Sequence, residues 1–78
     1  MEPRTLQAAE YVIRQGDPPK GLYFLQAGGL TAQLEEANGR VIRLRKMQPG
    51  IFIGELSLYA NAPASASVVA DQPSTIYF

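Results

Sequence analysis

The chain has 78 residues, with seven basic and seven acidic side chains, so its formal net charge is zero. A domain of this size buries only about 60% of the surface that its unfolded chain exposes, which predicts one small domain with a thin core. It has no cysteine and no histidine. Disulfides, thiolate metal sites and histidine-based acid–base catalysis are therefore excluded, and the zero net charge argues against non-specific nucleic-acid binding.

The sequence lacks an apolar run close to the ~20 residues of a membrane span. Its first ten residues are polar and mixed in charge, unlike a signal peptide. We therefore expect a cytoplasmic domain that has no metal, no membrane insertion and no direct contact with nucleic acid.

The first part of the chain predicts two strands separated by a turn. A β-type run at 11–14 ends in the sequence Gly-Asp-Pro-Pro at 16–19, which is a strong turn signal. Residues 22–25 are apolar without interruption, which is typical of a strand covered on both faces. The pair Gly28-Gly29 ends this second strand.

The middle of the chain predicts a β-hairpin, because apolar and polar side chains alternate on both sides of Asn38-Gly39. A two-residue loop would set Leu34 opposite Arg43 and mix the two faces. A three-residue loop at 37–39 matches the apolar faces and places Gly39 in the left-handed conformation of a bulge. The pairs expected for that loop are Glu36–Arg40, Leu34–Ile42 and Ala32–Leu44.

Four basic side chains cluster on the second strand of this hairpin, namely Arg40, Arg43, Arg45 and Lys46. The favoured interpretation is a solvated strand face that is partly neutralised by Glu35 and Glu36. A ligand or partner site is the alternative.

The last part of the chain predicts a turn, three short strands and one helical turn. The strands are expected at 51–53, 67–70 and 75–78, the helical turn at 55–59, and a further turn at 71–73. In all we expect six to eight short strands. The predicted fold is all-β, a β-roll or jelly roll with one short inserted helix.

The stretch GELSLYANAPASASVV, residues 54–69, has the layout of an anion-binding loop. The free N–H groups of a helical turn that begins near Glu55 would face a phosphate, and Gly54 would allow close approach. Ser65 and Ser67 would add hydroxyl donors, while Glu55 would accept from a sugar hydroxyl pair. In the alternative interpretation Gly54 is only a turn glycine and the small residues 64–67 only pack.

Three spaced pieces carry a resemblance to a known family: EYVIRQGDPPKGLYFLQAGGL, ANGRVIRLRKMQPGIFIGELSLY and APASASVVA, in this order. Together they resemble the cyclic nucleotide-binding domain of catabolite-activator-type regulators, kinase regulatory subunits and gated channels. The resemblance covers the chain from about residue 10 to its end. It implies a β-roll that carries a short phosphate-binding-cassette helix.

The resemblance also implies roles for eight ligand-binding positions, which are Gly54, Glu55, Leu56, Ser57, Ala64, Ser65, Ala66 and Ser67. The first four would begin the phosphate-binding cassette, with Glu55 on the ribose 2′-hydroxyl of a nucleotide such as cAMP. Ala64 stands where the family places the arginine that pairs with the phosphate. This departure predicts weak binding.

The resemblance leaves two functions open. The first is a regulatory sensor in signal transduction that binds cAMP, or another small anion, with reduced affinity. The second is a degenerate module that serves protein–protein contact or is a structural appendage. Parts of the sequence also look like the version of this domain that is appended to sulfate-permease-type transporters, so the host would be a transporter or another regulator. With no His or Cys and no paired carboxylates, an enzyme is disfavoured, and no catalytic residue is expected.

The chain ends inside a predicted strand. We therefore expect residues 1–78 to form a single domain that is truncated before the C-terminal helices of the family. Apolar edges such as STIYF, residues 74–78, would then favour self-association.

Overall fold

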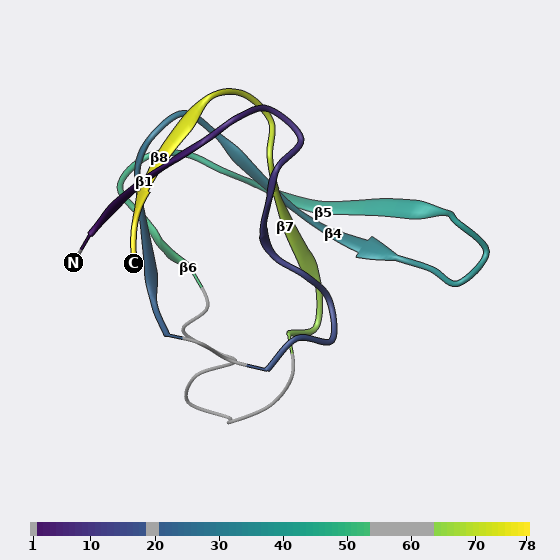
Figure 1. Cartoon of the computed structure of the whole chain (residues 1–78). Helices are drawn as coiled ribbons and strands as arrows, with labels where there is room; N and C mark the ends of the chain where they lie inside the picture. The colour runs from purple at the N-terminus through teal and green to yellow at the C-terminus, as the bar shows by residue number, and fades with distance from the viewer. Residues whose placement is uncertain (1, 19–20, 54–63) are drawn as a thin grey trace.

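The computed structural model describes residues 2–18, 21–53 and 64–78. In these residues eight strands form two four-stranded antiparallel sheets (Figure 1). The first sheet has the order β1 (Pro3–Leu6), β8 (Ser74–Tyr77), β3 (Tyr23–Ala27) and β6 (Phe52–Ile53). The second has the order β2 (Tyr11–Ile13), β7 (Ser67–Ala70), β4 (Leu30–Glu35) and β5 (Val41–Met47).

The predicted all-β roll is therefore confirmed. The predicted helical turn at 55–59 lies outside the described residues. No helix among the described residues is long and apolar enough to cross a bilayer.

The core lies between the two sheets and takes side chains from both of them. The buried apolar residues are Leu6, Tyr23, Leu25, Ile53 and Ile76 from the first sheet, and Leu30, Met47, Val68 and Ala70 from the second. Strands β3, β7 and β8 place alternate residues in this core, as period-two strand geometry requires. The core is small, as expected for the length of the chain.

The hairpin of β4 and β5 extends away from the rest of the molecule (Figure 1). Its three-residue loop is confirmed, because the backbone N–H of Glu36 donates to the carbonyl of Arg40 at 2.8 Å and Gly39 has a φ of 90°. Leu34 lies opposite Ile42, as predicted. The predicted pair of Ala32 with Leu44 is wrong. A bulge between Ala32 and Gln33 shifts the register, so that Ala32 faces Arg45.

The sequence analysis predicted the last strand, which is confirmed as β8, but its expectation that this strand is an exposed edge is wrong, and it missed β1. Strand β8 is hydrogen-bonded to β1 on one side and β3 on the other, so residues 74–77 do not form a sheet edge. The partner that covers this edge is β1, which the polar sequence at 3–6 did not suggest. Glu2 and Phe78 exchange backbone hydrogen bonds, and the two ends of the chain lie side by side (Figure 1). Self-association stays a prediction. The argument that β8 is an exposed edge no longer supports it, because β8 is paired on both sides.

Gly28 occupies a corner where the β3–β4 turn packs against the β7–β8 turn. Its φ is 96°, and a Cβ atom at this position would lie 2.2 Å from Ser74 Oγ and 2.6 Å from the carbonyl oxygen of Pro73. Ser74 is buried, and its hydroxyl accepts a hydrogen bond from the N–H of Gly29 at 3.1 Å. Both the backbone conformation and the close approach therefore require glycine here.

Candidate functional site

The eight predicted ligand-binding residues divide into two groups in the structure. Gly54, Glu55, Leu56 and Ser57 lie outside the described residues. The segment 64–67, which leads into β7, is described and is called the cassette exit below. Its surroundings are the part of the predicted site that the structure shows.

The backbone of Ala64 is paired with the turn that follows β2. Its N–H donates to the carbonyl of Asp17 at 2.8 Å, and its carbonyl accepts from the N–H of Gly16 at 2.9 Å. Both polar backbone groups of Ala64 are thus occupied. The position at which the resemblance expects an arginine therefore offers a ligand neither a basic side chain nor a free backbone donor.

Ser67 and Ser65 have different surroundings, although the sequence predicted the same role for both. Ser67 is fully buried, and its hydroxyl accepts from the N–H of Gln15 at 2.9 Å and donates to Glu35 Oε1 at 3.1 Å. Ser65 is exposed, and its hydroxyl makes no hydrogen bond to another described residue. Within the described residues, the hydroxyl of Ser67 is therefore bound, whereas that of Ser65 is exposed.

Glu35, at the end of β4, is the centre of a hydrogen-bond network around the cassette exit. Its carboxylate accepts from the hydroxyl of Tyr11, from Gln33 Nε2 at 3.0 Å and from Ser67. Its backbone N–H donates to Gln15 Oε1 at 2.9 Å. These five residues, from β2, the turn after it, β4 and β7, are called the cassette junction below.

The network changes the acidity of its two titratable groups. The hydrogen bond from Tyr11, followed by that from Gln33, lowers the pKa of Glu35 below its ordinary value, with a smaller contribution from Ser67. The same contact to Glu35 raises the pKa of Tyr11. The guanidinium of Arg14 lies over the Tyr11 ring, 4.0 Å from its centroid, and its charge also favours the ionised Glu35. Glu35 is therefore held as a carboxylate.

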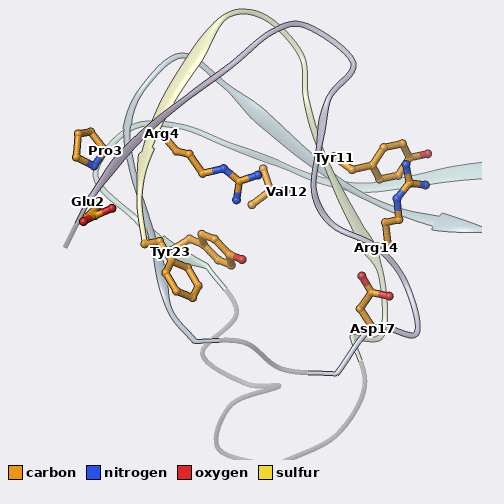
Figure 2. A pocket seen from close by; sticks show the side chains of 9 residues that line it. Glu2, Pro3, Arg4, Tyr11, Val12, Arg14, Asp17 and Tyr23 are labelled. Carbon is orange, nitrogen blue, oxygen red and sulfur yellow. The ribbon is translucent and has the colours of Figure 1, made fainter.

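A hollow of about 500 Å³ opens between the edge strands β1 and β2 (Figure 2). Tyr23 and Phe78, whose ring centroids are 4.9 Å apart, line one side of it, while Arg14 and Asp17 line the other. Arg4 lies opposite the buried Ile76 in the β1–β8 ladder, and its side chain extends from β1 toward β2. Residues 64–67 do not line this hollow, but its lining includes Tyr11 of the cassette junction and Asp17, whose carbonyl pairs with Ala64.

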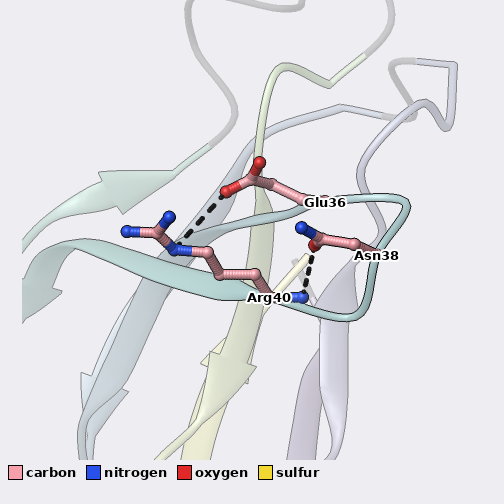
Figure 3. Close-up of polar contacts among 3 residues, drawn as sticks. All are labelled: Glu36, Asn38 and Arg40. Carbon is pink, nitrogen blue, oxygen red and sulfur yellow. Dashed lines mark hydrogen bonds and ion pairs between the residues drawn. The ribbon is translucent and has the colours of Figure 1, made fainter.

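The basic cluster on β5 fits the interpretation as a solvated strand face. Strand β5 is an edge strand, and it is exposed from Val41 to Lys46. The ion pair that involves it in the described residues joins Arg40 Nε to Glu36 Oε1 at 3.8 Å, and both side chains are largely exposed (Figure 3). The expectation that Glu35 would also neutralise this cluster is wrong, because its carboxylate is bound by the cassette junction.

Sequence reasoning did not identify Tyr11, Gln15 or Gln33 as part of the site. Gln33 lies only two residues from its partner Glu35. The other two residues have distant partners: Tyr11 is 24 residues from Glu35, and Gln15 is 52 residues from Ser67. No local pattern marks such pairs. Among the described residues, no group of three acidic side chains lies close enough to hold a metal ion.

Comparison with known proteins assigns the chain to a family. The model of the cyclic nucleotide-binding domain matches residues 3–78. The chain belongs to this family. The cyclic nucleotide-binding domain is thus a two-sheet roll in this chain.

Two curated proteins are similar to this chain over most of its length. The acetyltransferase Pat of Mycolicibacterium smegmatis is 34% identical over 73 residues, which cover 94% of this chain and 22% of the relative. The type II regulatory subunit of the cAMP-dependent protein kinase of Drosophila melanogaster is 33% identical over 67 residues, which cover 86% of this chain and 18% of the relative. The chain therefore spans about a fifth of the length of these curated relatives.

A solved structure with the same fold is the regulatory subunit of a cAMP-independent protein kinase A from Trypanosoma brucei, in a mutant form bound to cAMP. It superposes with a TM-score of 0.88 at 23% identity, over 96% of this chain and 28% of that chain. At this level of identity the similarity establishes the fold.

Proposed function

We propose that this chain is a regulatory ligand-sensing module that binds a cyclic nucleotide of the cAMP type with reduced affinity. The observation that carries the proposal is the match of the family over residues 3–78, together with the retained sequence Gly54-Glu55-Leu56 at the start of the cassette. The module would lie in the cytoplasm and regulate a host protein. That host would be a transporter or another regulator. No metal takes part.

The proposed ligand contacts follow the cassette. Gly54, Leu56 and Ser57 would present backbone N–H groups to the cyclic phosphate, and Glu55 would accept hydrogen bonds from the ribose 2′-hydroxyl. The exposed Ser65 hydroxyl would donate to the phosphate, while Ala66 leaves room beside it. Ser67 belongs to the predicted site but would not contact the ligand through its hydroxyl, because that hydroxyl is bound to Gln15 and Glu35. It would instead hold the neighbouring residues of the site in place.

The reduced affinity follows from Ala64. A hydrogen bond to a charged group contributes about 1.5–3 kcal/mol, and an arginine commonly makes two such bonds to a phosphate. A loss of about 3–5 kcal/mol corresponds to a binding constant that is weaker by roughly 10²–10⁴-fold. The paired backbone of Ala64 supplies no substitute donor for the missing side chain.

The Trypanosoma structure holds cAMP in a substituted form of its subunit. The subunit is described as cAMP-independent, and the mutant that holds cAMP carries three substitutions, one of which replaces a threonine by an arginine. That observation concerns the relative. For this chain it supports a test in which arginine is introduced at the position where the family expects it.

Calorimetric titration of the wild-type chain with cAMP and with cGMP tests the proposal. We expect measurable heat at millimolar nucleotide, with a dissociation constant far above that of the variant Ala64→Arg. The absence of heat with both nucleotides at millimolar concentration would contradict the proposal.

A second candidate function is a module that has lost its ligand and serves as a protein-contact or structural appendage of its host. Ala64 is the observation that favours it. The variant Ala64→Arg separates the two functions, because an intact pocket that lacks only its anchor gains at least roughly a hundredfold in affinity. If the variant gains nothing, the appendage is the better account.

A further inference from the structure

Two sets of hydrogen bonds hold the cassette exit in place. The residues that make them with residues 64 and 67 are not among the proposed ligand-binding residues. The first residue of the cassette exit, Ala64, is paired through its backbone with Gly16 and Asp17, in the turn after β2. Its last residue, Ser67, is held through its hydroxyl by Gln15 and Glu35. The exposed Ser65 lies between these two attachments, so its position depends on both of them.

Glu35 joins the two attachments. Its carboxylate holds Ser67, and its backbone N–H and carbonyl both bond to the side-chain amide of Gln15, at 2.9 and 3.4 Å. Gln15 directly precedes Gly16, which pairs with Ala64. A carboxylate suits this place because it only accepts hydrogen bonds, and here it meets three donors, on Tyr11, Gln33 and Ser67.

We propose that Glu35 is a positioning residue for nucleotide binding, which fixes residues 64–67 so that Ser65 faces the ligand before the ligand arrives. This inference rests on the proposed function. Glu35 itself does not touch the nucleotide. It acts by preorganisation, because a segment that is already ordered loses less conformational entropy on binding.

The next residue in the chain provides a matched control. Glu36 carries the same charge and makes one long ion pair at the exposed end of the hairpin (Figure 3). The variants Glu35→Ala and Glu36→Ala remove the same charge one residue apart. Any general effect of that charge on an anionic ligand is therefore largely common to both variants.

The first measurement needs no ligand. Amide hydrogen exchange of Gln15, Gly16 and Ala64 reports the two attachments directly, with the amide of Leu25 in the core as the internal reference. We expect Glu35→Ala to speed exchange at the three amides roughly tenfold relative to Leu25, as expected for the loss of a hydrogen bond to a charged group. Glu36→Ala should leave them unchanged. Equal exchange in the two variants would overturn the proposal, whether or not a nucleotide binds.

The second measurement is the affinity for cAMP, in the Ala64→Arg background if the wild-type titration is too weak to fit. We expect binding to be roughly tenfold weaker with Glu35→Ala than with Glu36→Ala. Equal or tighter binding with Glu35→Ala would overturn the positioning role. If no nucleotide binds in either background, the proposed function fails, and the exchange result alone decides whether Glu35 orders the segment.

A milder pair of variants guards against loss of the fold. Tyr11→Phe removes one donor to Glu35 and keeps the ring under Arg14, and it should speed the same exchange by a smaller factor. Glu35→Gln keeps one acceptor oxygen, so it should restore part of the exchange protection that Glu35→Ala loses. The role of the carboxylate would be contradicted by two results together. Glu35→Gln would exchange its amides as fast as Glu35→Ala, and Tyr11→Phe would exchange them as slowly as the wild type.

A pH profile of the affinity distinguishes positioning from simple packing. The charged and titratable groups that affect the pKa of Glu35 are Tyr11 and Arg14, and on the neighbouring strand β5 Arg43 lies opposite Gln33. We expect the ratio of wild-type to Glu35→Gln affinity to fall toward one as the pH drops through the titration of Glu35. A ratio that does not change with pH would show that the charge of Glu35 plays no part.

Discussion

Glu35 and Glu36 are neighbours in the chain, but they belong to two differently built regions. Glu36 is part of the hairpin tip, residues 36–40, where every polar contact joins residues at most four positions apart. Its carbonyl accepts from the N–H of Gly39 at 2.9 Å, and Asn38 Oδ1 accepts from the N–H of Arg40 at 2.9 Å (Figure 3). Glu35 is part of the cassette junction, where the contacts join four segments of the chain.

The two regions differ in whether their contacts are local or join distant parts of the chain. The hairpin tip is defined by a turn with its own local hydrogen bonds. The cassette junction exists only when β2, β4 and β7 are side by side in one sheet. The proposed ligand site therefore depends on the complete sheet, whereas the tip is expected to tolerate change.

The largest contrast is expected between two glycines. Gly28 and Gly39 both have φ near 90°, but a Cβ at Gly28 would collide with Ser74 and Pro73, while a Cβ at Gly39 meets nothing within 4 Å. We expect Gly28→Ala to lower the free energy of unfolding by at least about 2 kcal/mol and Gly39→Ala by about 1 kcal/mol. Urea unfolding measures both. Equal losses would mean that the corner adjusts and that only the backbone conformation matters.

A smaller contrast is expected between the two serines of the cassette exit. Ser67→Ala leaves the N–H of Gln15 and one oxygen of Glu35 without a partner, so it should cost about 1–3 kcal/mol of unfolding free energy. Ser65→Ala changes an exposed side chain and should cost less than about 0.5 kcal/mol, while it weakens nucleotide binding. The reverse order of the two stability losses would contradict the division of roles.

Sequence reasoning succeeded where contacts are local. The alternating pattern around Asn38-Gly39 determined the loop and the pairing of Leu34 with Ile42. It failed at the bulge beside Ala32, because that bulge depends on how β4 pairs with the strands on both of its sides. It also failed at β1, because this polar sequence forms a strand only by pairing with the otherwise unpaired edge of β8. Tertiary pairing thus overrode local propensity.

The candidate site divides in the same way. Sequence motifs placed the expected cassette at 54–67 and the missing charge at Ala64. They could not show that Ser67 is buried and bound while Ser65 is exposed, because that distinction depends on Glu35 and Gln15, which are 32 and 52 residues away from Ser67. The alternation of a strand places two such serines on one face but says nothing of the partners that each one meets.

The stability of the cassette junction should also depend on pH, in opposite directions at the two ends of the scale. The lowered pKa of Glu35 means that its contribution is complete above the ordinary value of 4.5 and is lost as the pH falls through the pKa of the folded state. The raised pKa of Tyr11 means that its contribution is complete below 10.0 and is lost as the pH rises through the pKa of the folded state.

Unfolding experiments at a series of pH values measure this dependence. The stability difference between wild type and Glu35→Gln should disappear in acid, and that between wild type and Tyr11→Phe should disappear in alkali. Glu36→Gln should show neither change. A difference that is constant over the whole range would contradict the assignment of the hydrogen bonds to the ionised Glu35 and the neutral Tyr11.

The smallest effect is expected at the hairpin tip itself. The ion pair between Arg40 and Glu36 is long and exposed, so Arg40→Ala should change the free energy of unfolding by less than about 0.5 kcal/mol. Thermal unfolding at low and high salt provides the check. A loss well above this value would mean that the tip supports the sheet more than its contacts indicate.

The most direct test of the central claim is an NMR titration of the ¹⁵N-labelled wild-type chain with cAMP up to millimolar concentration. The account predicts that amide signals of residues 64–67 and of the cassette shift in a saturable way, while those of the hairpin tip at 38–40 stay in place. Shifts confined to the hollow lined by Arg4 and Tyr23, or no shifts at all, would contradict nucleotide binding at the cassette.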